Sequence, residues 1–405
     1  MAILSNSNLP IPSPAAQAQS QQLAALIQQK IRESGGWINF ATFMHMALYL
    51  PALGYYSGGA TKFGQAGDFV TAPEISPLFA QTLAKQTAQI LLETNGDVLE
   101  LGAGTGKLAA DLLLELATLN QLPSQYFILE VSDHLRQIQL ETLQKKLQPE
   151  LFEKIVWLDA LPPPYPQPSP SRGEGVQGFV GLILANEVLD AIPAHILHKT
   201  TEAWRERGVG FTNEFVWQDA PLSAFDLIEN LPQNLIKVLP ENYVTEVCPA
   251  ALGLVNSLAN CLKQGVILMI DYGFGAAEYY HPQRNQGTLM CHYQHYAHDN
   301  PLINVGLQDI TAHVNFTAIA EAGVAQGLTL AGYCNQASFL INCGLLDILA
   351  EVSPNDMAAY APLAAAAQKL LSPAEMGELF KVIGFTKNMD EPLIGFTVGD
   401  KTHAL

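Results

Sequence analysis

The sequence has little positive charge and few cysteines. Its 405 residues include 20 Lys and Arg against 38 Asp and Glu, which gives a formal net charge of −18. A nucleic-acid-binding protein needs a basic surface that displaces the counterions of the phosphates, so this balance argues against a nucleic-acid partner. The five cysteines are scattered and form no C-x-x-C pair. They are typical of buried thiols in a reducing compartment and argue against a disulfide framework or a zinc site.

Long apolar runs and several catalytic motifs are also missing. No run reaches the ~18 apolar residues needed to span a bilayer, and no basic residue precedes Lys30. We therefore predict no membrane insertion, no leader peptide and a cytoplasmic location. The three histidines of HYQHYAH (292–298) have no cysteine or carboxylate at ligand spacing, so no metal site is expected. The absence of G-x-S-x-G, H-E-x-x-H and kinase-type motifs disfavours hydrolases and kinases.

The residues that are present favour a large core built from alternating strands and helices. Hydrophobic residues make up 49% of the chain and charged residues 14%, which excludes wholesale disorder. From residue 97, short apolar runs alternate with helical stretches. This pattern predicts an α/β, Rossmann-like fold with a parallel sheet covered on both faces. The predicted strands are 97–102, 126–131, 155–158, 182–185 and 266–271, and the predicted helices are 108–119, 134–146 and 250–262.

The flanking composition predicts the domain organisation. We expect a flexible Ser/Asn/Pro-rich tail at 1–14 and an N-terminal helical region at 15–93, which contains a glycine-rich stretch. Three strand-like runs predict an inserted β-hairpin subdomain at 195–245. The remaining residues, 94–194 and 246–400, are predicted to form the sheet core.

Several segments within that core do not follow the alternation. Residues 161–178 are Pro-rich and are predicted to form a surface insertion. Residues 274–316 are rich in Gly, His and Tyr and are long enough to be a functional loop. A helical part at about 317–376 is expected to precede a strand pair near 380–386 and 394–398.

The strongest local signal is VLELGAGTG at 98–106, in which a predicted strand runs into a glycine turn and then a helix. The G-x-G-x-G spacing lets bare backbone approach a ligand. Lys107 stands where a dinucleotide motif needs its third glycine, and no phosphate-binding pattern is present, which favours a nucleoside without phosphates. Glu100 would repel a pyrophosphate but suits an ammonium or sulfonium charge, so S-adenosylmethionine is favoured. The alternative is a structural turn without a ligand.

Two acidic residues at the ends of the next predicted strands extend this site. Glu130 lies 24 residues after Gly106 and can bind the two ribose hydroxyls of an adenosyl group. A solvated glutamate at the start of a loop is the alternative. Asp159 could reach the adenine amino group, although a local structural role is favoured for a single residue of this kind.

The fourth predicted strand runs into NEVLDAIP (186–193), at the end of the sheet where ligands bind in open parallel sheets. A helical turn here would place the carboxylates of Glu187 and Asp190 on one side. The two groups could hold a guanidinium and orient one nitrogen for attack on a methyl group. The alternative is that Asn186 caps a helix whose first turn carries the two acids.

A further segment, GLQDITAHVNF (306–316), supplies candidates for the rim of the active site. These are Asp309, Thr311 and His313. A helix cap around Asp309 is the alternative.

Taken together, these segments resemble the MidA family. The resemblance is carried by GYYSGG (54–59), FGQAGDFVTAPEISPLF (63–79), VLELGAGTG, NEVLDAIP, DYGFG (271–275) and GLQDITAHVNF, in this order. It implies a class I S-adenosylmethionine-dependent methyltransferase with a seven-stranded sheet and a protein arginine as the methyl acceptor. It also implies a respiratory complex I subunit as the partner, because mitochondrial members serve complex I assembly. Finally, it implies that residues 67–76, especially Thr71 and Glu74, fold over the cofactor or the acceptor.

The leading hypothesis is therefore a protein arginine methyltransferase that uses S-adenosylmethionine and acts on a protein with an accessible arginine. The predicted catalytic residues are Glu187 and Asp190. The predicted cofactor-binding residues are Thr71, Glu74, Glu100, Gly102, Ala103, Gly104, Gly106, Glu130, Asp159 and Asn186. Two alternatives stay open: an assembly or binding protein that retains the cofactor fold without catalysis, and a small-molecule methyltransferase.

Overall fold

The computed structural model describes residues 9–58, 71–163 and 178–405. The described chain forms two compact units, each built from separate stretches of sequence. The first unit takes its residues from Met1–Val70, Leu189–Leu252 and Phe274–Asn315, and the second from Thr71–Val188, Gly253–Gly273 and Phe316–Leu405. Most of the predicted glycine-rich stretch and of the Pro-rich insertion, and the first residues of the predicted tail, lie outside the described residues.

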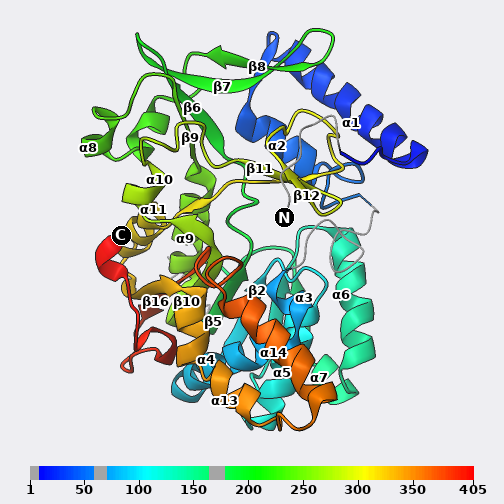
Figure 1. Cartoon of the computed structure of the whole chain (residues 1–405), viewed down its shortest axis with the longest axis vertical. Helices are drawn as coiled ribbons and strands as arrows, with labels where there is room; N and C mark the ends of the chain where they lie inside the picture. The colour runs from blue at the N-terminus through cyan, green and yellow to red at the C-terminus, as the bar shows by residue number, and fades with distance from the viewer. Residues whose placement is uncertain (1–8, 59–70, 164–177) are drawn as a thin grey trace, which may run out of the picture. The chain divides into compact units, whose positions relative to one another are not determined.

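The second unit contains the predicted α/β sheet (Figure 1). Its strand order is β15-β16-β10-β5-β2-β3-β4. The pairs from β10 to β4 are parallel, whereas β16 runs antiparallel to both β10 and β15. The strands are β2 (Asp97–Leu101), β3 (Tyr126–Leu129), β4 (Ile155–Leu158), β5 (Phe179–Asn186), β10 (Leu262–Phe274), β15 (Thr329–Asn335) and β16 (Phe380–Lys387). The five strands predicted from apolar runs are confirmed.

Helices cover this sheet because their apolar faces match the apolar strand residues. Those of the second unit are α3 (Ala72–Ile75), α4 (Pro77–Thr94), α5 (Lys107–Thr118), α6 (Asp133–Lys146), α7 (Pro149–Phe152), α11 (Phe316–Ala325), α12 (Gln336–Asn342), α13 (Leu345–Ala350) and α14 (Met357–Leu371), with short 3₁₀ turns η3 (Ile394–Phe396) and η4 (Thr402–Ala404). Helix α9 (Pro249–Cys261) begins in the first unit and ends in the second.

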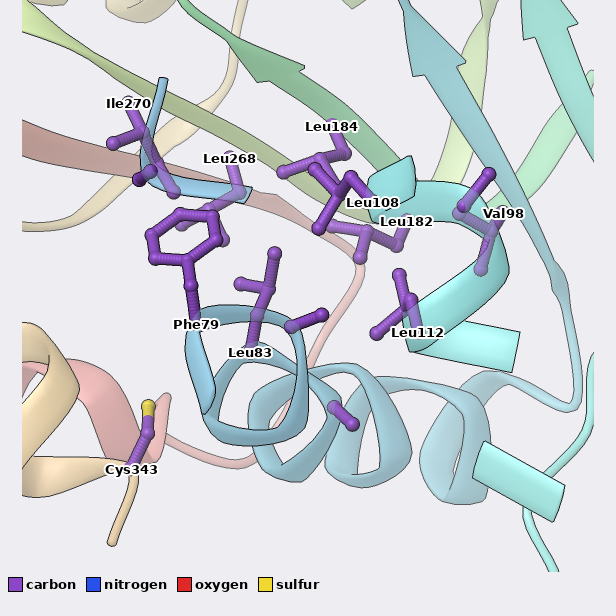
Figure 2. Close-up of a cluster of buried hydrophobic side chains, with 14 of the residues drawn as sticks. Phe79, Leu83, Val98, Leu108, Leu112, Leu182, Leu184, Leu268, Ile270 and Cys343 are labelled. Atoms are coloured by element: carbon purple, nitrogen blue, oxygen red, sulfur yellow. The ribbon is translucent and has the colours of Figure 1, made fainter. Parts of the chain in front are cut away.

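The core of the second unit lies between α4, α5 and the sheet. Figure 2 shows the side chains of Phe79 and Leu83, from α4, pointing toward the strands. Leu112 of α5 joins the same cluster. The strand side chains of this cluster are Val98, Leu182, Leu184, Leu268 and Ile270, all fully buried or nearly so. Burial of each such side chain contributes about 1.5–3 kcal/mol relative to exposure, which fixes α4 and α5 against β5 and β10.

Two predictions for the C-terminal part are wrong. The expected helical part at 317–376 contains strand β15, and residues 394–396 form η3 instead of a strand. The backbone N–H groups of Ile394 and Gly395 donate to side-chain oxygens of Gln89 and Gln86 on α4, at 3.1 and 2.9 Å. Because α4 takes these two donors, this segment does not pair as a strand, and β16 pairs with β15 and β10.

The first unit contains a five-stranded sheet with the order β1-β7-β6-β9, in which β8 pairs with β7. The antiparallel β6, β7 and β8 confirm the hairpins predicted after residue 195. The strands are β1 (Trp37–Asn39), β6 (His195–Lys199), β7 (Trp204–Phe211), β8 (Phe215–Ala220) and β9 (Tyr243–Val247). The helices are α1 (Pro14–Glu33), α2 (Phe40–Tyr49), α8 (Gln233–Ile236) and α10 (Ala276–Tyr279), with the 3₁₀ turn η2 (Phe225–Asn230).

The Gly/His/Tyr-rich segment also belongs to the first unit. It forms a three-stranded sheet of order β12-β11-β13 and a short strand, β14. These strands are β11 (Met290–Tyr293), β12 (Tyr296–His298), β13 (Asp309–Thr311) and β14 (Val314–Asn315). Cys291 and Ile310 are buried in one cluster with Phe40 and Phe43 of α2. The division into units therefore differs from the predicted domains: residues 274–315 pack with the N-terminal helices, whereas residues 71–93 pack with the central sheet.

Candidate active site

The glycine turn lies at the topological switch point of the central sheet. From β2 the chain moves to β3 and β4 on one side, and it returns to β5 on the other side of β2. Ligands bind at such a point, outside the carboxyl ends of the strands. The ends of β2, β3 and β5 carry the glycine turn, Glu130 and Asn186, so the structure brings three of the predicted segments to one edge.

The glycines of the turn serve different purposes. A Cβ at Gly106 would lie 3.2 Å from Cα of Gln139, so this glycine allows α6 to pack closely against the turn. At Gly104, with φ +54°, no heavy atom of the described chain beyond the glycine and its two sequence neighbours lies within 4 Å of the position of a Cβ. The backbone at Gly104 is therefore accessible to a ligand.

Glu100 carries a buried carboxyl group on β2, two residues before the glycine turn begins. The hydroxyl of Tyr126 on β3 donates to its Oε2 at 2.7 Å. Burial raises the pKa of Glu100 to about 7; the Tyr126 hydrogen bond opposes this shift and the charge of Glu130 adds to it. Its role toward the amino-acid part of the cofactor stays a prediction, and its charge depends on pH near neutrality.

Glu130 and Asp159 differ sharply in exposure. Glu130 is buried, and its carboxylate accepts from the N–H of Ser132 at 2.9 Å and from Nε2 of Gln139 at 3.0 Å. The carboxylate of Asp159 is 94% exposed and forms an ion pair with Arg136 at 2.8 Å. Arg136 also donates to the carbonyl of Glu130. The ribose role of Glu130 and the adenine role of Asp159 stay predictions.

Strand β5 is followed by a strained residue, Glu187. Glu187 has φ +54°, a left-handed conformation that is uncommon outside glycine and clusters at functional sites. Its N–H donates to the carbonyl of Ile270 at 2.9 Å, and its Oε1 accepts from the N–H of Ala72 at 3.4 Å. Beside it, Oδ1 of Asn186 is buried and has no hydrogen-bond partner within the described chain.

The helical turn predicted for Glu187 and Asp190 is wrong, and so is the alternative of a helix capped by Asn186. No helix lies between β5 and β6 in the described chain. The left-handed backbone at Glu187 turns the chain away from helical geometry, and the N–H of Val188 donates to Oδ2 of Asp271 at 3.1 Å. The chain passes from the second unit to the first between Val188 and Leu189.

Helix α3 forms part of the predicted covering segment at 67–76, of which residues 67–70 lie outside the described residues, and it contacts the glycine turn. Thr71 caps α3 with its carbonyl, which accepts from the N–H of Glu74 at 3.0 Å. Oε1 of Glu74 accepts from the hydroxyl of Thr105, inside the turn, at 2.5 Å. The two residues therefore sit beside the turn and Glu187, and their contact with a cofactor stays a prediction.

Asp190 belongs to a buried polar cluster of the first unit. Its carbonyl accepts from the N–H of Ala312 at 2.9 Å. The hydroxyl of Tyr56 donates to Oδ1 of Asp309 at 2.9 Å. Burial, followed by the charges of Asp309 and nearby groups including Asp190, raises the pKa of Tyr56 well above its usual value. Tyr56 was not singled out from the sequence, although the GYYSGG segment contains it.

The remaining rim candidates have structural contacts. Asp309 opens strand β13, so a helix cap there is wrong. The hydroxyl of Thr311 donates to the carbonyl of Met290 at 3.3 Å. The ring of His313 stacks on Phe274 at 5.2 Å between centroids. Their roles at a rim stay predictions.

The histidine-rich strand pair shows no metal-binding geometry. Burial lowers the pKa of His292 to about 4, so its ring is neutral at physiological pH. Within residues 9–58, 71–163 and 178–405, no group of three or more His, Cys, Asp or Glu side chains is placed to hold a metal ion. None of the helices in these residues combines the length and the hydropathy that a membrane span requires.

This fold and turn define a methyltransferase that uses S-adenosyl-L-methionine, and comparison with known proteins agrees. The model of an S-adenosyl-L-methionine-dependent methyltransferase family matches residues 80–334. The chain belongs to this MidA-like family. The resemblance, the fold class and the cofactor predicted from the sequence are confirmed.

A solved structure supports the cofactor directly. A likely methyl transferase from Burkholderia thailandensis, whose crystal structure has S-adenosyl-homocysteine bound, is 48% identical and has a TM-score of 0.90. The match covers 98% of this chain and 100% of that one. The residues of this chain fit such a ligand, because Gly104 leaves accessible backbone and Asn186 carries a buried oxygen without a partner in the described chain.

More distant relatives bear an enzyme name. Protein arginine methyltransferase NDUFAF7, mitochondrial, is 29% identical in Danio rerio, with 85% of this chain and 82% of that protein covered. The Homo sapiens protein of that name is 28% identical, with coverage of 87% and 81%.

These names correct the predicted cytoplasmic location, because the relatives are mitochondrial proteins. The cytoplasmic location was predicted from scattered cysteines, which indicate a reducing compartment, and from the lack of a recognisable leader peptide. Free thiols separate reducing from oxidising compartments but do not distinguish one reducing compartment from another.

Proposed function

We propose that this methyltransferase transfers a methyl group to a guanidinium nitrogen of an arginine on a protein. The names of the NDUFAF7 relatives support this acceptor. The observation that carries the proposal is the strained Glu187, a carboxylate held at the end of β5 beside the segment that contacts the glycine turn. By the family resemblance, the partner we propose is a respiratory complex I subunit.

Glu187 and Asp190 are assigned to the acceptor. An arginine side chain stays protonated near neutral pH, so a nearby carboxylate must stabilise its charge until a proton leaves. A carboxylate can accept two guanidinium N–H groups and so fix the direction of the nitrogen that attacks. The left-handed backbone of Glu187 fixes the direction in which its side chain leaves the main chain. Asp190, three residues later, would supply a second acceptor.

The other predicted residues hold the cofactor. When bound, S-adenosylmethionine would supply a methyl group from its positively charged sulfur and leave as S-adenosyl-homocysteine. The proton that the methylated nitrogen releases would pass to the Glu187 carboxylate. Gly104 offers backbone without a side chain, Glu130 would accept the ribose hydroxyls, and Glu100 would face the amino-acid part. Asn186 would donate or accept at its buried amide. These groups would bind the cofactor and orient its methyl group toward the acceptor. The acceleration of methyl transfer would then come from positioning the two reactants.

The test uses radiolabelled S-adenosylmethionine and an extract of cells that lack the protein. A labelled protein that disappears when its candidate arginine is replaced by lysine supports the proposal. A labelled metabolite would instead identify a small-molecule methyltransferase. If no product is labelled and the protein still binds the cofactor, the result would favour the alternative of a non-catalytic assembly protein.

A Gly104→Val variant is the control for this assay. Valine fills the accessible side of the turn and is disfavoured at φ +54°. It should abolish labelling and S-adenosyl-homocysteine binding while sparing simple partner binding. Labelling by this variant at the wild-type rate would show that the product does not depend on this site.

A further inference from the structure

Gln139, on α6, joins three parts of the cofactor site without being exposed to solvent. Its side chain is fully buried. Nε2 donates to Oε2 of Glu130 at 3.0 Å and to the carbonyl of Gly104 at 3.1 Å. Oε1 accepts from the indole Nε1 of Trp157, on β4, at 3.0 Å. The ends of β2, β3 and β4 thus converge on one amide.

The orientation of this amide is fixed by chemistry. An indole N–H can only donate, so the amide atom facing Trp157 must be the oxygen. The amide nitrogen must then face Glu130 and Gly104, which both offer acceptors. A reversed amide would set oxygen against oxygen at Glu130 and at Gly104, and N–H against N–H at Trp157. Each of these contacts is unfavourable for a buried group.

From this arrangement we infer that Gln139 is a positioning residue that sets the Glu130 carboxylate and the glycine turn for the adenosyl ligand, with Trp157 fixing the amide. A carboxylate can accept up to about four hydrogen bonds. The Glu130 carboxylate can therefore accept from Gln139 and still accept from the ribose hydroxyls. The inference rests on the ribose role proposed for Glu130. It does not depend on the nature of the methyl acceptor.

Leucine at position 139 tests this role because it has a similar size and no donor. Affinities are measured by calorimetry for S-adenosyl-homocysteine and for its 2′-deoxyribose analogue. Wild-type protein should prefer the intact ribose. Gln139→Leu should bind S-adenosyl-homocysteine roughly ten- to a hundredfold more weakly, as expected for a lost hydrogen bond to a charged group. It should also lose most of the preference over the analogue.

A merely structural role would weaken both ligands equally and keep the preference. That result would overturn the inference, as would unchanged affinity in Gln139→Leu. A wild-type protein without any ribose preference would also overturn it, because Glu130 would then have no ribose role. Since every readout is ligand binding, none of these results bears on whether the acceptor is an arginine.

Trp157→Phe provides a second, milder variant in case Gln139→Leu folds poorly. Removing the indole N–H leaves the buried amide oxygen of Gln139 without this donor and loosens the amide, which Glu130 and Gly104 alone still orient. The ribose preference should therefore fall, though less than in Gln139→Leu. In the double variant the loss should equal that of Gln139→Leu alone, because Trp157 acts through Gln139. Additive losses, or a wild-type preference in Trp157→Phe, would contradict the inference.

Gln137→Leu is the matched control on the same helix. Gln137 is exposed, and its amide donates to Oε1 of Glu141 on the same helix at 2.8 Å. This variant should keep the wild-type affinities and ribose preference. Thermal unfolding of all variants identifies any that bind weakly because they are partly unfolded.

Discussion

At the scale of single residues, Glu187 is the side chain on which the proposed chemistry depends most. Glu187→Gln keeps the size of the side chain and an oxygen that can accept from Ala72. It removes the charge that would stabilise a guanidinium. We expect unchanged affinity for S-adenosyl-homocysteine and a loss of about 100-fold or more in turnover.

Steady-state labelling and calorimetry measure the two quantities. Glu153→Gln, at an exposed position, is the control and should keep full turnover. If Glu187→Gln methylates at the wild-type rate, the assignment of Glu187 to the acceptor is wrong.

Glu100 allows a prediction about pH. Its folded-state pKa of about 7 lies above the unfolded value of 4.5, so the folded protein retains this proton where the unfolded chain releases it. The free energy of unfolding should therefore fall as pH rises from 4.5 to 7. The loss is on the order of 3 kcal/mol once both states are ionised.

Glu100→Gln mimics the protonated side chain and should lack this loss. Its stability relative to wild type should rise with pH across that interval, as measured by urea unfolding of the ligand-free proteins. A stability difference that does not change with pH would show that Glu100 has an ordinary pKa.

The candidate site could be predicted from the sequence only where the signal is local. The glycine turn, Glu130 and Glu187 follow apolar strands, so their place at the sheet edge follows from the alternation. Tyr56 and Asp309 are separated by 253 positions, and no local pattern records that they contact each other. The left-handed conformation of Glu187 was also missed, because a glutamate carries no sequence signal for it.

At the scale of elements, strands with continuous apolar runs were predictable and the C-terminal ones were not. Strand β15 contains Gly332 and lies among alanine-rich helices, so the local composition favours helix. The IGFTV segment at 394–398 has the composition of a strand. It forms η3 because two glutamines of α4 bind its N–H groups.

This explanation of η3 predicts a measurable loss of stability. Gln86 is fully buried, and its oxygen accepts from the N–H of Gly395 at 2.9 Å. Gln86→Leu leaves that N–H without its acceptor and should lower the free energy of unfolding by about 1–3 kcal/mol. Gln144→Leu, at an exposed position on α6, should change it by less than about 0.5 kcal/mol. Equal effects of the two substitutions in denaturant titrations would refute this account.

At the scale of the whole molecule, the net charge of −18 bears on the acceptor. A strongly acidic protein attracts cationic segments, and salt screens this attraction over about 8 Å at physiological ionic strength. An arginine peptide flanked by lysines should therefore show a KM that rises with ionic strength, at unchanged kcat. The same peptide flanked by glutamates should show a KM that falls. Identical salt dependence for both peptides would mean that the charge of the protein does not guide the acceptor.

The position of β16 has a consequence for how the protein is made. This strand begins at Phe380, yet it lies inside the sheet, between β10 and β15. On the ribosome, β10 and β15 would emerge before the strand that separates them, with unpaired edges available to each other or to another chain. The sheet therefore closes only after β16 has been synthesised, and a nonsense mutation that removes residues after 379 should yield an aggregation-prone product instead of a shortened enzyme.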